Sequence, residues 1–192
     1  MIILETIDTP IGSYAPDFEL PGIDDHVHHL SRYRENLRAL CVISMSNHCP
    51  YVDLYLERLK NIQTEFSPNG FTLIGLNGTD GNNDMNAEAE FSTKLTFENM
   101  KTFALHHQLN FPYLWDSTQD VTRSFGAIST PTAYLIDHEG ILRYKGQIDD
   151  HPTDPLIKGV DYLKNAIASL FQGQEIQPEQ TQQAGTPLIW RK

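Results

Sequence analysis

The sequence is poor in cysteine and in basic side chains, and it holds no long apolar run. Only two cysteines occur among 192 residues, which excludes a fold held together by disulfides and favours a reducing compartment. Lysine and arginine number 14 against 25 aspartates and glutamates, so the net charge of −11 disfavours nucleic acid or an anionic membrane as a partner. No stretch approaches the roughly 18 apolar residues of a membrane span. Because residues 1–5 also lack the basic and apolar character of a secretory leader, we expect a cytoplasmic protein.

The order of apolar patterns predicts an α/β fold with a mixed central sheet flanked by helices. Nearly continuous apolar segments predict strands at residues 37–43, 71–76, 111–115, 133–136 and 141–144. Apolar residues spaced by three and four predict helices at residues 52–66, 97–104, 118–125 and 156–170. A polar turn containing Gly140 separates the last two strands and predicts a hairpin. Strands and helices that alternate and then end in a hairpin indicate a mixed sheet.

The length and the composition predict one domain over residues 1–171 and a tail over residues 172–192. A chain of this size can bury its own core without metal or disulfide support. Residues 172–183 are polar and rich in glutamine, which is typical of an extended segment leaving a domain. Residues 187–190 are apolar again, so we expect the end of the tail to dock on the domain.

The segment Ser46-Asn47-His48-Cys49-Pro50 lies between the first strand and the helix that follows it. Functional residues of open α/β sheets collect at the carboxyl ends of strands, which makes this the expected place for a site. Proline is tolerated in the first turn of a helix, so Cys49 should lie at the helix start. Unpaired backbone N–H groups, the helix dipole and a protonated His48 would all favour a thiolate there. From position alone, a small buried side chain is as well supported as a reactive thiol.

Several motifs resemble one known group of redox proteins. Residues 15–20, Ala-Pro-Asp-Phe-Glu-Leu, resemble the opening strand of thioredoxin-like proteins. Residues 46–52 resemble the Cys-Asn-His-Cys-Pro-Tyr-Val signature of a peroxiredoxin-like branch of the alkyl hydroperoxide reductase/thiol-specific antioxidant superfamily, and residues 111–114, 126–131, 146–150 and 181–190 are similar to it in the same order. The resemblance implies a thioredoxin-like fold with an N-terminal β-hairpin extension and thiol-based redox chemistry. It also implies a cis peptide bond between Thr130 and Pro131 that faces Cys49, in a loop that holds an extended substrate.

Three positions carry a hydroxyl where this branch carries cysteine: Ser46, Ser129 and Thr186. Ser46 cannot form a disulfide with Cys49, which excludes the two-thiol cycle of thioredoxin. The spacing of Ser46 and Cys49 is instead similar to a peroxiredoxin site, where the hydroxyl binds peroxide and thiolate while the cysteine becomes a sulfenic acid. Two parts of that site differ here, since Val42 replaces its usual proline and its usual arginine is missing. Arg123 is a weak substitute, because a solvated helix position explains it better.

Cys41 is the second thiol of the chain, and its position predicts a core residue. It lies on the first buried strand, and the five residues from Cys41 to Ser46 span about 16 Å at the rise of a strand. A disulfide needs Cα atoms within about 7 Å of each other. Oxidised Cys49 must therefore be reduced by an external thiol or by Cys49 of a second subunit in a homodimer.

These observations leave three functions open. The first is a one-cysteine peroxiredoxin-like oxidoreductase, an antioxidant that reduces a small hydroperoxide through Cys49 with help from Ser46 and His48. The second is a monothiol protein that exchanges disulfides with glutathione or with partner proteins. The third is a redox-inactive binding protein of the same fold.

The residues expected to bind the substrate are Asn47, Thr130 and Pro131. We expect neither a cofactor nor a metal ion. The histidines at 26, 28 and 29, close to Asp24 and Asp25, have the residue types of a metal site. The resemblance places them on a surface hairpin, which disfavours that interpretation.

Overall fold

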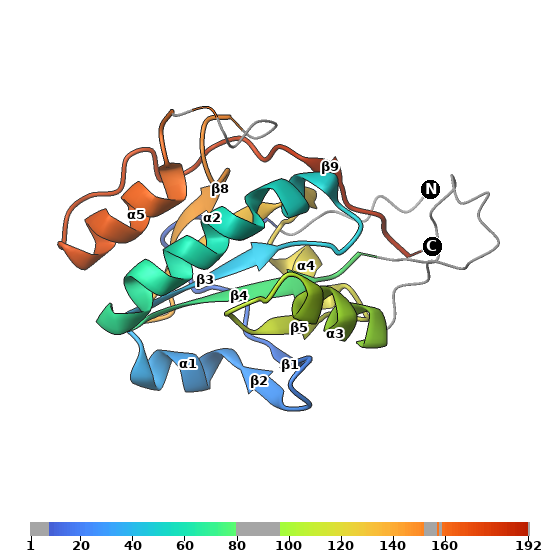
Figure 1. The fold of residues 1–192 in the computed structure, drawn as a ribbon. Coiled ribbons are helices and arrows are strands. Elements are labelled where there is room, and N and C mark those ends of the chain that lie inside the picture. The colour runs from blue at the N-terminus through green and yellow to red at the C-terminus, as the bar shows by residue number, and fades with distance from the viewer. Residues whose placement is uncertain (1–7, 80–96, 152–156, 158, 192) are drawn as a thin grey trace, which may run out of the picture.

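The computed structural model describes residues 8–79, 97–151, 157 and 159–191, and a five-stranded sheet forms its centre (Figure 1). The strands lie in the order β5-β4-β3-β7-β8. Their bounds are β3 (Ala39–Ser44), β4 (Phe71–Asn77), β5 (Tyr113–Trp115), β7 (Thr132–Asp137) and β8 (Leu142–Gly146). β3, β4 and β5 run parallel, whereas β7 is antiparallel to both β3 and β8. The structure thus confirms the mixed central sheet and the hairpin of its last two strands.

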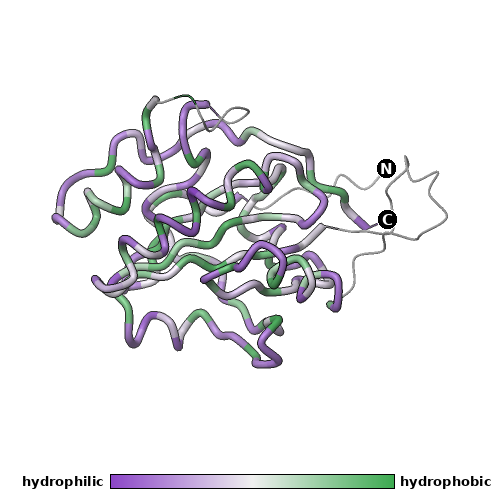
Figure 2. Tube along the Cα trace, viewed as in Figure 1, coloured by the Kyte–Doolittle hydropathy of each residue, from purple (hydrophilic) through white to green (hydrophobic). Residues whose placement is uncertain are grey.

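Helices cover the sheet on both faces, which explains why its strands are so apolar. β3 is buried along its whole length, and its side chains alternate between two cores. Cys41 and Ile43 share one core with α2 (Pro50–Phe66), α3 (Phe97–His106) and α5 (Tyr162–Phe171), and a 3₁₀ turn, η1 (Ser67–Asn69), follows α2. Leu40 and Val42 face the other core, to which α1 (Leu30–Asn36) contributes Leu30 and α4 (Asp120–Ser124) contributes Val121. The hydropathy colouring of Figure 2 shows apolar residues concentrated along the central strands.

The structure confirms the N-terminal hairpin and differs from the predicted elements in three places. β1 (Glu19–Pro21) pairs antiparallel with β2 (Val27–His29), so the opening strand is shorter than residues 15–20 suggested. α1 was not predicted, because this seven-residue helix buries only Leu30 and shows almost no apolar periodicity. The last helix begins at Tyr162 rather than near residue 156, since Val160 is exposed and pairs its backbone with Asp150. Leu156, expected in that helix, lies outside the described residues.

The C-terminal segment runs back across the domain and passes beside the start of α2 before it ends (Figure 1). Gln180 forms a parallel bridge with Lys145 of β8. Further along, β9 (Thr186–Pro187) pairs antiparallel with β6 (Ser129–Thr130), and Leu188 is buried in the core below. This course carries residues far apart in the sequence to the carboxyl end of β3. Within the described ranges, none of the helices has the length and apolar character needed to cross a bilayer.

Candidate active site

Cys49 is the N-cap residue of α2, directly before Pro50, and its side chain makes no capping hydrogen bond. Its backbone is extended (φ −92°, ψ 113°), and its carbonyl accepts hydrogen bonds from the N–H groups of Val52 and Asp53 at 3.0 and 3.3 Å. Pro50 follows in the first turn, as the sequence predicts. The thiol makes no hydrogen bond to the helix N–H groups, so the donors expected to favour a thiolate do not pair with the sulfur in this structure. The residue is 1% exposed.

Two oxygen atoms contact the Cys49 sulfur, and they come from distant segments. The thiol can donate its one hydrogen to the carbonyl oxygen of Thr130 or to the Oγ1 atom of Thr186, each of which lies 3.2 Å from the sulfur. The peptide bond from Thr130 to Pro131 is cis, which confirms the expectation for this loop. A carbonyl can only accept a hydrogen bond, so the Thr130 contact stabilises the neutral thiol. The Thr186 hydroxyl can also donate, and it would therefore stabilise a thiolate.

Ser46 and His48 precede Cys49 in the sequence, and neither side chain hydrogen-bonds to its sulfur. Ser46 is buried, and its Oγ atom accepts a hydrogen bond from the backbone N–H of His48 at 3.3 Å. Its carbonyl accepts from the N–H of Cys49 at 3.2 Å, which closes the turn before α2. Between these two described residues, no hydrogen bond joins the Ser46 hydroxyl to the Cys49 sulfur. His48 is exposed and lines a shallow hollow of about 300 Å³ together with His106 and His107.

Asn47 ties the loop before α2 to the neighbouring strands. Its Oδ1 atom accepts hydrogen bonds from the hydroxyl of Tyr113 at 2.7 Å and from the amide of Asn77 at 2.9 Å. The Asn77 amide also donates to the Tyr113 hydroxyl at 2.8 Å, so the three side chains form a closed triangle. Burial raises the pKa of Tyr113, which keeps its hydroxyl protonated as a donor. Asn47 therefore holds the loop in place, and substrate binding by its side chain stays a prediction.

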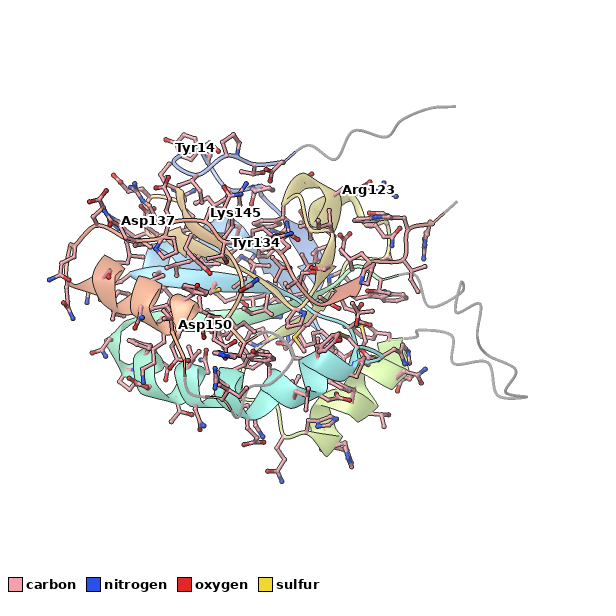
Figure 3. All side chains as sticks on the ribbon, turned by 90° about the horizontal axis from the view of Figure 1, so that it is seen from above. Tyr14, Arg123, Tyr134, Asp137, Lys145 and Asp150 are labelled. Atoms are coloured by element: carbon pink, nitrogen blue, oxygen red, sulfur yellow. The ribbon has the colours of Figure 1, made fainter. Side chains whose placement is uncertain are left out.

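Two other candidates from the sequence are engaged elsewhere. Cys41 is fully buried on β3, and burial raises the pKa of its thiol, which confirms it as a core residue. Arg123, labelled in Figure 3, places its guanidinium 4.3 Å from the centre of the Trp190 ring. It thus contacts the tail instead of the sulfur. On the hairpin, His28 lies between the side chains of Asp24 and Tyr33 and hydrogen-bonds to both.

Comparison with protein families decides what kind of chain carries this site. The model of the AhpC/TSA family matches residues 11–145, a span that includes the sheet, α2 and the loop of Thr130. The chain belongs to the AhpC/TSA family. No curated protein matches the sequence.

Solved structures place this AhpC/TSA chain among thioredoxin-like folds. A hypothetical protein from Sinorhizobium meliloti is 27% identical, with a TM-score of 0.82 and coverage of 96% of each chain. The thioredoxin domain of a thiol-disulfide oxidoreductase from Bacteroides vulgatus has a TM-score of 0.62 at 19% identity, covering 85% of this chain and 99% of that one. Peroxidoxin BcpB from Mycobacterium tuberculosis has a TM-score of 0.57 at 13% identity, covering 84% and 94%. The last two likenesses establish the fold, and the family establishes a redoxin domain.

Thr186 is the residue of this AhpC/TSA site that sequence reasoning missed. It lies 137 residues from Cys49, and local patterns carry no information about such a contact. One signal was present, because Ser46, Ser129 and Thr186 each replace a cysteine of the related branch, and thiols of one redox cycle must meet in space. The structure brings Thr186 to the sulfur and leaves Ser46 beside it.

Proposed function

We propose that this AhpC/TSA chain is a one-cysteine thiol peroxidase in which Cys49 reduces a small hydroperoxide. The observation that carries the proposal is the enclosure of the sulfur: Cys49 is 1% exposed, and a hydroxyl able to donate to a thiolate lies 3.2 Å away. A diatomic peroxide group demands far less space than a protein disulfide. The start of α2 adds a favourable field for a negative sulfur, because the dipole of a 17-residue helix points its positive end at Cys49.

The proposed reaction needs only one sulfur of this chain. The thiolate attacks one peroxide oxygen, the O–O bond breaks, and the departing oxygen takes up a proton to leave as water or an alcohol. Cys49 gives up two electrons and becomes a sulfenic acid. An external thiol then displaces water to form a mixed disulfide, and a second thiol molecule releases Cys49 in reduced form. Cys41 takes no part, since it is fully buried on β3 with a raised pKa.

The second candidate function is monothiol exchange with disulfides. It is favoured by the carbonyl oxygen of Thr130, which lies 3.2 Å from the sulfur in the loop expected to hold an extended substrate. In this reaction Cys49 attacks one sulfur of a disulfide and expels the other as a thiolate, so no net oxidation occurs. The partner would be oxidised glutathione or a protein disulfide. A cytoplasmic location and a homodimer stay predictions from the sequence.

Trapping of the oxidised sulfur separates these functions. Reduced wild-type protein is mixed with one equivalent of hydrogen peroxide and the sulfenic-acid trap dimedone, and peptide masses locate the adduct. We expect the adduct on Cys49, its loss in Cys49→Ser, and its retention in the matched variant Cys41→Ser. Oxidised glutathione in place of peroxide tests for a mixed disulfide on the same residue. A mixed disulfide with glutathione but no dimedone adduct would support disulfide exchange as the function. No reaction of Cys49 with either reagent would support a redox-inactive binding protein.

A further inference from the structure

Hydrogen bonds hold the C-terminal tail to the domain on both sides of Cys49, so the residues between these bonds lie across the site. Before the site, the side-chain amide of Gln183 donates to the carbonyl of Gly126 at 2.8 Å. After it, the backbone N–H of Leu188 donates to the carbonyl of Ile128 at 3.0 Å. Residues 184–187 between these points are called the tail bridge below. They are held against the sulfur by attachments at both ends.

The tail bridge takes up the edge of β6 that lies next to the sulfur. Thr130 of β6 pairs with Thr186, and Ser129 pairs with Pro187. A free strand edge is a template on which an extended segment of another chain can pair. Because the carbonyl of Thr130 also contacts the Cys49 sulfur, any strand paired there would present its side chain to that sulfur. In this protein the side chain so presented is Thr186 of the chain itself.

We infer that the tail bridge is the specificity-determining element of the Cys49 site. By occupying the edge of β6, it admits small hydroperoxides and excludes disulfides carried on extended segments of other proteins. This inference rests on the proposed function and names the substrate class of the same site. A protein disulfide can reach Cys49 along β6 only when Thr186 and Pro187 have left that edge.

Gly185 is the residue that lets the tail bridge lie so close. Its backbone has φ +144°, in a region that disfavours other residues, and a Cβ atom at this position would stand 2.1 Å from the carbonyl oxygen of Thr130. The substitution Gly185→Ala must therefore push the tail bridge off β6. Gly173 offers a matched control in the same tail segment, since it also has a positive φ (+67°) and a Cβ there would meet nothing within 4 Å.

Two probes measure the selectivity of each variant in the reduced full-length protein. One is hydrogen peroxide, and the other is a blocked extended peptide whose cysteine is joined by a disulfide to 2-nitro-5-thiobenzoate. Attack by Cys49 on the peptide sulfur forms a mixed disulfide and releases the coloured thiolate, with no net oxidation. We expect Gly185→Ala to raise the ratio of the disulfide rate to the peroxide rate by about tenfold or more, the scale on which one or two lost backbone hydrogen bonds act. Gly173→Ala should keep the wild-type ratio.

An unchanged ratio in Gly185→Ala overturns the inference about the tail bridge. A wild-type peroxide rate no higher than that of free cysteine overturns the proposed function, and the ratio still decides the role of the tail bridge. Circular dichroism and thermal unfolding establish that each variant is folded before its rates are compared.

The variant Thr186→Cys tests the same inference without relying on Gly185→Ala to fold. Since the atoms Sγ of Cys49 and Oγ1 of Thr186 are 3.2 Å apart, the thiol oxidant diamide should join the two sulfurs. The protein loses two hydrogens, and the reagent gains them. We expect the cross-linked protein to react with neither probe and dithiothreitol to restore both reactions. Failure to cross-link, or full reactivity of the cross-linked protein, would contradict the placement of the tail bridge over Cys49.

Discussion

The hydroxyl that assists Cys49 should be that of Thr186, and the variant Thr186→Val isolates its contribution. Valine keeps the branched shape of threonine and removes only the group that lies 3.2 Å from the sulfur. A hydrogen bond to a charged partner contributes about 1.5–3 kcal/mol. Since 1.4 kcal/mol corresponds to about tenfold in an equilibrium constant, the reaction of Cys49 with peroxide at neutral pH should slow by about ten- to a hundredfold.

Ser46→Ala is the matched comparison, because the peroxiredoxin-like spacing assigns the same role to Ser46. In the structure its hydroxyl accepts from the N–H of His48 and does not hydrogen-bond to the sulfur. The loss should therefore stay within about threefold, the effect of a neutral hydrogen bond of roughly half a kcal/mol. The assay is stopped-flow measurement of peroxide consumption by equal concentrations of each reduced protein at several pH values. A larger loss in Ser46→Ala than in Thr186→Val would refute the assignment.

Three further predictions concern the stability of the domain around the site. Burial raises the pKa of Cys41 in the folded protein, so the thiol of the unfolded chain loses its proton at a lower pH. Above about pH 9 the free energy of unfolding of wild type should therefore fall by up to about 1.4 kcal/mol per pH unit more than that of Cys41→Ala. Urea unfolding over a pH series measures this difference, and equal slopes would contradict it. Asn47→Ala leaves the buried hydroxyl of Tyr113 without its acceptor, which should cost about 1–3 kcal/mol in the same assay; an unchanged midpoint would show that the contact adds nothing. Asp149→Asn removes the charge of a buried carboxylate that pairs with Arg58. Because Arg58 keeps its ion pair with Asp161, the loss should be that of one hydrogen bond to a charged group, about 1.5–3 kcal/mol; a neutral result would count against the pair.

The sheet, most of its helices and the position of Cys49 follow from local patterns in the sequence. Continuous apolar strands and helical spacing report directly which faces are buried, and β3 and α2 are clear cases. The cis bond before Pro131 follows from the family resemblance. The sequence does not predict α1, because a short helix that buries only Leu30 has too few apolar positions to show a helical period.

The atoms that contact the Cys49 sulfur could not be predicted from local sequence patterns. The position of Cys49 predicted N–H donors from its own helix, whereas the structure surrounds the sulfur with oxygens of Thr130 and Thr186 from segments 81 and 137 residues away. The side chain of an N-cap residue can turn toward its helix or toward other segments, and the packing of distant segments decides between these directions. Asn47 illustrates the same limit, since its partners come from β4 and β5.

The rate constant for wild-type Cys49 with hydrogen peroxide at neutral pH tests the central claim most directly. If the start of α2 and the hydroxyl of Thr186 activate this sulfur, it should react about a hundredfold faster than free cysteine in the same buffer, the scale on which positioned hydrogen-bond donors accelerate reactions. A rate at or below that of free cysteine would show that Cys49 is a buried structural thiol.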